Sequence, residues 1–367
     1  HRGLNHRVRA MVLAGDSLYA AGRFTKTNDG SLTSLGRVAR IDLADGAWQA
    51  LPNQGLSDEA LALALLDGDL YVGGWFTQTV DTALTDLGNI ARYDPTADTW
   101  QALPNQGLDG LIFGLGVVGS DLYAGGLFAQ SGDGAVTDLN GVARYDSLSG
   151  TWQALPNQGL NGNVYALTAG GSAIYAGGSF SRTGDGSLTN LGNIAHYDAA
   201  AGTWQALPNQ GLNGTVNGLW VSGSDVYVGG DFTQTNDGAV TNLNGVARYD
   251  SLSGKWRALP NQGLNHNAYA FAVLGDDIYV GGTFDQTADG SLTNLNHIAR
   301  YDPAANTWHA VPNQGVNSWV YALVPVDDDL YVGGEFNQVV EGKVSGLNRI
   351  ARFGEIDKVY LPLMVRS

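Results

Sequence analysis

Seven near-copies of one hydrophobic stretch predict an all-β chain folded as a seven-bladed β-propeller. The stretch reads Leu-Tyr-Val-Gly-Gly-Trp-Phe at residues 70–76, and its copies begin at residues 18, 122, 174, 226, 278 and 330, always 52 residues apart. A period of this size suits a four-stranded propeller blade. Gly accounts for 52 of 367 residues, which fits many tight turns and disfavours long helices. We therefore expect four antiparallel strands per blade and almost no helix.

An unbroken repeat favours one closed ring, residues 1–367, over the two or three domains that this length otherwise suggests. The predicted blades are 6–52, 58–104, 110–156, 162–208, 214–260, 266–312 and 318–364. The chain starts at a blade boundary, and residues 359–363 can supply the last outer strand. We therefore expect blade one to pack against blade seven without an exchanged strand.

The first strand of each blade is predicted to be the innermost. In blade one it covers Val8 to Leu13. One position of this strand is always small, as a crowded strand near the ring axis requires. The residues at this position are Ala10, Ala62, Gly114, Ala166, Gly218, Ala270 and Ala322.

The repeated stretch itself is predicted to be the second strand, after a short turn rich in Gly and Asp. Its hydrophobic-Tyr-hydrophobic pattern suits burial on both faces, and its Gly pair permits a close backbone approach or a bulge. A long polar loop follows, for example residues 233–243, and it differs little between copies.

The third strand reads Ile-Ala-Arg-Tyr-Asp at residues 90–94, and the period of two places Arg92 and Asp94 on one face. Five such pairs recur, so we interpret them as structural salt bridges, either with each other or with neighbouring strands. The fourth strand carries a recurrent Trp, which Tyr360 replaces in blade seven. We expect these Trp residues to pack in the core. Trp75, Trp220 and Trp319 break the repeat; core packing is the favoured interpretation for them too, and lining a pocket is the alternative.

A hydrophobic strand ending in Gly-Gly, then Tyr-Asp, then Trp, as in Gly125-Gly126, Tyr145-Asp146 and Trp152, resembles the Kelch repeat of β-propellers. The longer pattern, with Gly-Gly-x-Phe-Thr and Ile-Ala-Arg-Tyr-Asp, is similar to propeller repeats of bacterial extracellular proteins of the Rax2-like and galactose-oxidase central-domain type. The resemblance covers essentially the whole chain and implies a secreted or cell-surface protein. It does not select a function, because such propellers serve as enzymes, adhesins and scaffolds. The copper chemistry of galactose oxidase does not carry over, since that site needs a Cys-linked Tyr and this chain has no Cys.

The charge balance narrows the classes of partner. Asp and Glu number 35 against 19 Lys and Arg, and the net charge of −16 repels phosphate backbones and anionic lipid. Nucleic acid and membrane surfaces are therefore poor candidates. Hydrophobic runs are far shorter than the roughly 18 residues that a membrane span needs. The chain begins at His1 without a hydrophobic leader, so we expect any signal peptide to be missing from this sequence.

Two repeated segments are the candidate ligand-binding elements: the linker Pro-Asn-Gln-Gly and the Asp-Gly loop. In a blade of consecutive strands both leave the same face of the ring, where amide and carboxylate side chains can hydrogen-bond a sugar. The predicted binding residues are Asn53, Gln54, Asn105, Gln106, Asn157, Gln158, Asn209, Gln210, Asn261, Gln262, Asn313, Gln314, Asp29, Asp133, Asp185, Asp237 and Asp289. The alternative interpretation is that these turn-forming residues only fix the angle between blades. The innermost strand has drifted between copies while the linker has not, which keeps the ligand hypothesis open.

No catalytic set stands out from the repeat, and the six histidines look like drift between copies. We therefore predict a protein that is not an enzyme, with no metal site and no cofactor. Calcium is the one alternative, although one carboxylate per loop is sparse for a tight site. The competing enzyme hypothesis is a polysaccharide hydrolase or lyase that uses Trp75, Asp231 and Glu335 in the central funnel.

The functional prediction is an extracellular, monomeric propeller that binds a ligand, most plausibly a carbohydrate, at repeated shallow sites on the loop rim. Several weak sites acting on one polymer raise the apparent affinity. The acidic balance favours neutral or basic glycans. The remaining alternative is a rigid scaffold or protein-docking ring within a larger surface protein.

Overall fold

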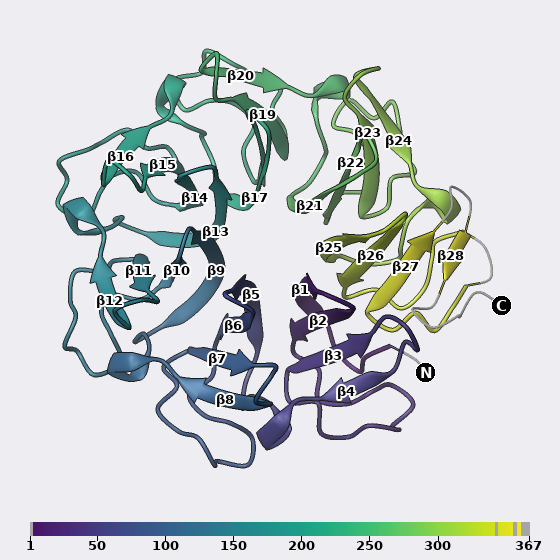
Figure 1. The fold of residues 1–367 in the computed structure, drawn as a ribbon. Coiled ribbons are helices and arrows are strands. Elements are labelled where there is room, and N and C mark those ends of the chain that lie inside the picture. Colours follow the sequence, from purple (N-terminus) through teal and green to yellow (C-terminus); the bar gives the residue numbers. More distant parts are fainter. Residues whose placement is uncertain (1–2, 342–343, 355–357, 361–367) are drawn as a thin grey trace.

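The computed structural model describes all residues except 1–2, 342–343, 355–357 and 361–367. Seven four-stranded sheets stand around a central axis as the blades of a ring (Figure 1). Each sheet uses four strands that are consecutive in the sequence, and every neighbouring pair is antiparallel. The predicted seven-bladed β-propeller is thus confirmed.

The first strands line the axis, and the second strands pack outside them (Figure 1). The first strands are β1 (Val8–Ala14), β5 (Ala60–Leu66), β9 (Leu111–Val118), β13 (Asn163–Gly170), β17 (Val216–Ser222), β21 (Ala268–Leu274) and β25 (Val320–Val326). The second strands are β2 (Ser17–Gly22), β6 (Asp69–Gly74), β10 (Asp121–Leu127), β14 (Ala173–Ser179), β18 (Asp225–Gly230), β22 (Asp277–Gly282) and β26 (Asp329–Gly334).

The third and fourth strands form the outer half of each blade. The third strands are β3 (Val38–Asp42), β7 (Ile90–Asp94), β11 (Val142–Asp146), β15 (Ile194–Asp198), β19 (Val246–Asp250), β23 (Ile298–Asp302) and β27 (Ile350–Gly354). The fourth strands are β4 (Trp48–Ala50), β8 (Thr99–Ala102), β12 (Thr151–Ala154), β16 (Thr203–Ala206), β20 (Lys255–Ala258), β24 (Thr307–Ala310) and β28 (Lys358–Tyr360).

Small residues on the innermost strand reflect contact between neighbouring blades. A Cβ atom added to Gly218 would lie 2.5 Å from the carbonyl oxygen of Tyr269, on the first strand of the next blade. This backbone approach leaves no room for a larger side chain and explains the recurrent Ala or Gly.

The Gly pair of the second strand serves both roles expected of it. A Cβ atom on Gly73 would lie 2.5 Å from Cγ2 of Ile112 in the next blade, and one on Gly74 would lie 2.3 Å from the carbonyl oxygen of Glu59. Beside this pair the register of the first strand shifts between Ala60 and Ala62, as at a β-bulge. The glycines therefore admit the neighbouring blade on one side and the bulged strand on the other.

The core lies between blades rather than within a single one. One buried cluster joins Tyr71 and Ile90 of blade two to Trp152 of blade three. The six repeated Trp side chains are at most 6% exposed, which confirms their predicted core role. The indole nitrogen of Trp100 also donates to the carbonyl oxygen of Pro52 at 3.1 Å, so the outer strand is tied to the linker that precedes its blade.

In five blades the repeated Arg of the third strand bonds to an Asp at the start of the second strand, so of the two predicted arrangements the neighbouring strand supplies the main partner. In blade one Ser17 takes the Asp position, and Arg40 donates to the side-chain oxygen of Gln49 at 3.1 Å. Nε of Arg144 lies 2.8 Å from Oδ2 of Asp121, whereas the carboxylate of Asp146 is 3.9 Å from the same guanidinium. The equivalent pairs are Arg92–Asp69, Arg248–Asp225, Arg300–Asp277 and Arg352–Asp329.

Blade seven closes the ring with its own strands, as predicted, because its sheet runs β25-β26-β27-β28. The backbone N–H of Leu4 donates to the carbonyl oxygen of Asn348 at 2.7 Å, which repeats the bond from Leu56 to Gly36 between blades one and two. The closing seam therefore has the same backbone geometry as an internal seam.

The predicted equivalence of Tyr360 with the repeated Trp is wrong. Val359 pairs with Phe353, which occupies the Tyr position of the repeat, and Tyr360 pairs with Arg352. Residues 354–358 separate the paired positions in this blade, one residue fewer than the 302–307 that separate Tyr301 from Trp308. The pairing of β28 with β27 is therefore offset by one position from the pairing in the other blades. Residues 361–363 of the predicted strand lie outside the described residues.

Candidate binding surface

The two faces of the ring differ in their connections. The long loops between second and third strands and the linkers between blades share one face, here called the loop face. The short turns lie on the other, the turn face. Isolated bridges such as Leu56↔Thr79 and Leu108↔Ser131 join each linker to the long loop of the blade it enters. Both candidate segments therefore crowd one rim, as predicted.

The backbone geometry of the linker accounts for much of its sequence. Three successive residues adopt positive φ: Asn53 at 55°, Gln54 at 58° and Gly55 at 77°. Gly and Asn are the residues that tolerate this region best. The pattern recurs in the short 3₁₀ turns η1 (Pro52–Gln54), η2 (Pro104–Gln106), η3 (Pro156–Gln158), η4 (Pro208–Gln210), η5 (Pro260–Gln262) and η6 (Pro312–Gln314).

The predicted linker Asn and loop Asp residues contact each other. Nδ2 of Asn105 donates to Oδ2 of Asp133 at 3.1 Å, while Oδ1 of Asp133 accepts from the Ser131 hydroxyl and from the N–H of Ala135. The same pairing joins Asn53 to Asp81, Asn157 to Asp185, Asn209 to Asp237 and Asn261 to Asp289. These side chains hold the linker against the loop.

Hydrogen bonds stabilise the ionised form of the loop carboxylates. The Ser31 hydroxyl, the Ser31 N–H and the Thr27 hydroxyl lower the pKa of Asp29 to about 2. The equivalent groups of Ser291 and Thr287 lower the pKa of Asp289 to about 2. These oxygens are engaged within the loop, and the described residues contain no group of three or more side chains suited to a metal ion.

Gln side chains are the predicted residues that remain available to a ligand. Within the described part of the chain, five linker Gln side chains are exposed and make no side-chain hydrogen bond: Gln54, Gln106, Gln158, Gln210 and Gln262. In the sixth linker Asn313 is half-buried, and Gln314 instead donates to the carboxylate of Glu341. Whether the linkers bind anything stays a prediction.

A second surface lies around the axis on the loop face, where three positions of the repeat change from charged to polar to aromatic between blades. The N–H of Trp75 donates to the carbonyl oxygen of Glu59 at 2.8 Å, which places two of these positions side by side. The third position lines an axial cavity of about 410 Å³. We call the three positions together the variable mouth. The position of Glu59 holds Arg7, Glu59, Leu111, Asn163, Thr215, Asn267 and Trp319 in blades one to seven. The position of Trp75 holds Arg23, Trp75, Leu127, Ser179, Asp231, Thr283 and Glu335. The position that lines the cavity holds Arg9, Leu61, Phe113, Tyr165, Asn217, Tyr269 and Tyr321.

The sector of the mouth at the closing seam is rich in arginine. The guanidinium of Arg7 binds both carboxylate oxygens of Glu59, at 2.7 and 2.9 Å, and Nε of Arg9 lies 3.1 Å from the same carboxylate. Burial alone would raise the pKa of Glu59, but these hydrogen bonds lower it. Arg9 also stacks over the ring of Tyr321 at 4.2 Å. Exposed Arg23 lies nearby. The three arginines of this sector outnumber its two carboxylates, Glu59 and Glu335, although the chain carries a net charge of −16.

Large apolar side chains are exposed elsewhere on the mouth. Trp75 is 59% exposed, Leu127 51% and Trp319 45%. The predicted core packing of Trp75 and Trp319 is therefore wrong, whereas half-buried Trp220 does pack against the cluster that contains Phe271. Each exposed Trp occurs in only one copy of the repeat, but so does Trp220, so this sequence signal does not distinguish exposed from packed Trp residues.

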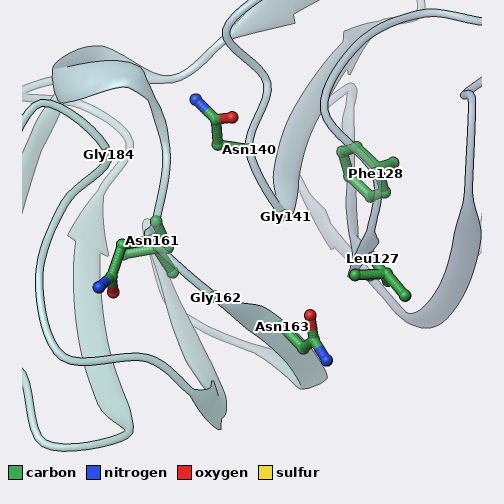
Figure 2. Close-up of a pocket in the computed structure, with 10 residues that line it drawn as sticks. Leu127, Phe128, Asn140, Gly141, Asn161, Gly162, Asn163 and Gly184 are labelled. Carbon is green, nitrogen blue, oxygen red and sulfur yellow. The ribbon is translucent and has the colours of Figure 1, made fainter.

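A hollow of about 300 Å³ adjoins the mouth at the seam between blades three and four. Figure 2 shows Asn140, Gly141 and Leu127 of blade three facing Asn161 to Asn163 of blade four across this hollow. In the preceding seam the amide nitrogen of Asn89 reaches the linker carbonyl of Leu108 at 3.0 Å. Gly141 replaces that Asn, and a Cβ atom added to it would lie 2.7 Å from the carbonyl oxygen of Gly162, so the backbone of blade four lies close to this position.

The residues of the enzyme hypothesis do not form one group. Trp75, Asp231 and Glu335 occupy the same position of the repeat on blades two, five and seven. Glu335 lies 3.9 Å from the Arg7 guanidinium and accepts a hydrogen bond of 3.4 Å from Tyr321. The two carboxylates therefore stand on different blades, with blade six between them.

Comparisons with known proteins support the resemblance to Rax2-like and Kelch-like repeats. Polarized growth protein rax2 of Schizosaccharomyces pombe is 27% identical over 164 residues, covering 41% of this chain and 13% of that protein. Polarized growth protein L1 of Phoma sp. is 31% identical over 157 residues, covering 40% of this chain and 11% of that protein. Kelch-like protein terF of Aspergillus terreus is 28% identical over 142 residues, covering 36% of this chain and 30% of that protein. The chain thus matches less than a third of each relative, and these relatives do not support the expected bacterial origin.

No family model matches the chain. Among solved structures, the crystal structure of the computationally designed Ika8 protein matches with a TM-score of 0.54 at 15% identity, over 91% of this chain and 95% of that one. This likeness supports the fold alone. Within the described residues, none of the helices has the length and hydrophobicity to cross a membrane.

Proposed function

We propose that the chain is a non-catalytic, protein-binding propeller that contacts its partner through the variable mouth. One observation carries the proposal: the repeat is nearly identical in its linkers, loops and core, but its residue types diverge where side chains surround the axis. Exposure alone does not explain this divergence. Ala50, Ala102, Ala154, Ala206 and Ala258 on the fourth strands are also exposed, and Ala310 is half-buried, yet this position is Ala in all six blades.

The chemistry of the mouth suits a protein partner. Its exposed Trp, half-buried Tyr and clustered Arg belong to the residue types that contribute most at protein interfaces. Large exposed apolar side chains on a folded protein mark interaction sites. The names of the relatives, Kelch-like and polarized growth proteins, agree with an interaction module within a longer protein.

A displayed library of random peptides tests this proposal. We expect the enriched peptides to lose about tenfold or more in affinity on the variant Trp75→Ala/Trp319→Ala, because buried aromatic anchors contribute about 2 kcal/mol or more each. The matched control is Leu148→Ala/Leu252→Ala, which removes two exposed Leu side chains from turn-face loops. Peptides that bind both variants equally, or that depend on the control residues, would refute the mouth as the binding surface.

A glycan is the second candidate ligand, and the five exposed linker Gln residues are the observation that favours it. Their amides stand at equivalent places on the loop rim, so one polymer can engage several of them and gain about 10²–10⁴ in apparent affinity. This function requires a secreted or cell-surface location, as the resemblance implies. A glycan array with and without calcium, repeated with all five Gln changed to Ala, distinguishes the candidates. Binding that survives the change in a folded variant would exclude the linkers as the sugar site.

A further inference from the structure

On the turn face, the seam between blades four and five contains a cavity at a place where the sequence of blade four departs from the repeat. Its volume is about 340 Å³, and its lining includes Tyr175, His196, Asp198, Tyr249 and Ser251. Asp198 ends β15 and Ser251 follows β19, so both lie at the end of the blade opposite to the variable mouth. The cavity is therefore independent of the surface proposed above.

The cavity lies where five other blades hold the repeated ion pair. Blade four has Ala173 at the Asp position and His196 at the Arg position, so both charged side chains are replaced together. The backbone register is unchanged, since Ala173 still pairs with Asp198 and Tyr175 with His196. The cavity thus results from two smaller side chains on an intact sheet.

The equivalent seams between other blades show which group occupies the corresponding space. The Arg92 guanidinium lies close enough to Tyr145 of the next blade to lower the pKa of that phenol, against the increase from burial. Arg248 acts in the same way on Tyr301. Burial and Asp250 both raise the pKa of Tyr249, and no cationic side chain lines its cavity within the described residues.

The lining offers acceptors and ring faces. Oδ1 of Asp198 accepts the N–H groups of Ala200 and Ala201, each at 3.0 Å, and Oδ2 has no protein partner among the described residues. The ring centroids of Tyr175 and His196 are 4.9 Å apart. Burial lowers the pKa of His196, although Asp198 and Gln205 oppose the shift. The imidazole is therefore neutral near pH 7, and one ring nitrogen can accept a hydrogen bond.

We propose that this cavity binds a guanidinium group, the head group of an arginine side chain, in place of the arginine that blade four lacks. The free oxygen of Asp198 and the neutral imidazole accept its N–H groups, and the aromatic faces contact its plane. An ammonium group fits less well, because it is strongly hydrated and lacks the planar shape. The ligand is either a small guanidinium compound or an arginine presented by a peptide.

Amide NMR titrations with methylguanidinium, methylammonium and the peptide Gly-Arg-Gly test the proposal. For one ionic contact in a half-open cavity we expect a Kd on the order of 1 mM for methylguanidinium. The shifts should be saturable and confined to the lining residues, and methylammonium should bind at least about fivefold more weakly. Binding of Gly-Arg-Gly would show that an arginine in a peptide reaches the site, whereas binding of methylguanidinium alone would assign a small molecule.

Two variants make the test specific. Ala173→Asp/His196→Arg restores the Arg–Asp ion pair that five other blades contain. The protein should therefore fold normally and lose methylguanidinium binding. Asp198→Asn removes the anionic acceptor and should weaken binding about tenfold. Saturable shifts that persist in the first variant, shifts located elsewhere, equal binding of methylammonium, or no saturable shift in the parent protein would each overturn the proposal.

Discussion

Individual loop residues hold the rim together through short polar contacts. Asp289 accepts the hydroxyls of Thr287 and Ser291 at 2.8 and 2.6 Å, and its second oxygen accepts the amide of Asn261 across the linker. The backbone N–H of Ser291 also donates to this carboxylate, and these four donors stabilise the anion even though the group is exposed to water. In five blades the repeated Asp thus holds its loop against the linker through a hydrogen bond to the linker Asn.

The first prediction concerns the pH at which the hydrogen bonds to the ionised carboxylate of Asp289 are lost. Because the pKa of Asp289 is about 2 rather than 3.8, its contribution to stability is present above about pH 4 and disappears as the pH falls through 2. Carboxyl NMR titration of Thr287→Val/Ser291→Ala should show the pKa of Asp289 rising towards 3.8, while that of Asp29 stays near 2. An unchanged Asp289 midpoint would show that these hydroxyls do not hold the carboxylate.

At this scale the sequence predicted where the repeated polar side chains lie but not what they contact. The Asn and Asp of neighbouring segments are 28 residues apart in the chain, and only the folded rim brings Asn105 to Asp133. The exposure of Trp75 could not be predicted in the same way. An aromatic residue next to a buried strand suggests core packing, and only the bulge in the first strand and the place of Trp75 near the propeller axis show that it is exposed.

Strands and linkers can be predicted from the sequence more reliably than side-chain contacts. The hydrophobic period and the positions of Gly and Pro determine the backbone conformation of the residues beside them. The register within blade seven is the exception: one residue fewer separates the paired positions of β27 and β28, so a fixed 52-residue offset assigns Tyr360 to a position that Val359 occupies.

The second prediction tests the Gly pair of the second strand. Gly73→Ala should lower the free energy of unfolding by about 1–3 kcal/mol, since its Cβ would meet Cγ2 of Ile112 at 2.5 Å. Blade one supplies the matched control, because Ala21 already occupies this position and packs with the smaller Ala60. Ala21→Gly should cost only about 0.5–1 kcal/mol. Denaturant unfolding that gives equal losses for both variants would contradict a steric role for the pair.

The whole molecule depends on seven equivalent seams, one of which closes the ring. Leu4 and Leu56 occupy the same position at the closing seam and at the first internal seam, and they are 1% and 0% exposed. Their N–H groups make the same bond to the preceding blade. The closing seam should therefore contribute as much as any other.

The third prediction compares these two residues. Leu4→Ala and Leu56→Ala should each lower the free energy of unfolding by about 2–5 kcal/mol, within about 1 kcal/mol of each other, because each leaves a cavity in an equivalent core. Denaturant melts monitored by Trp fluorescence give both values. A much smaller loss for Leu4→Ala would mean that the ring is frayed at its closure.

At the scale of the ring, the sequence predicted the number of blades, the strand order and the shared rim. The candidate site, however, was assigned to the repeated linkers and loops. Residues 52 positions apart become neighbours around one axis only when the ring closes, so the drift of Arg9, Phe113 and Tyr165 reads as noise along the chain and as one surface in space. We therefore assign binding to the positions that differ between blades.

Hydrogen exchange of the protein with and without the strongest library-selected peptide tests this claim most directly. We expect slowed amide exchange around residues 7–9, 59–63 and 319–321 at the mouth, and unchanged exchange in the linkers that include Gln106 and Gln210. Protection confined to the linkers and long loops, with no change around the axis, would contradict the account.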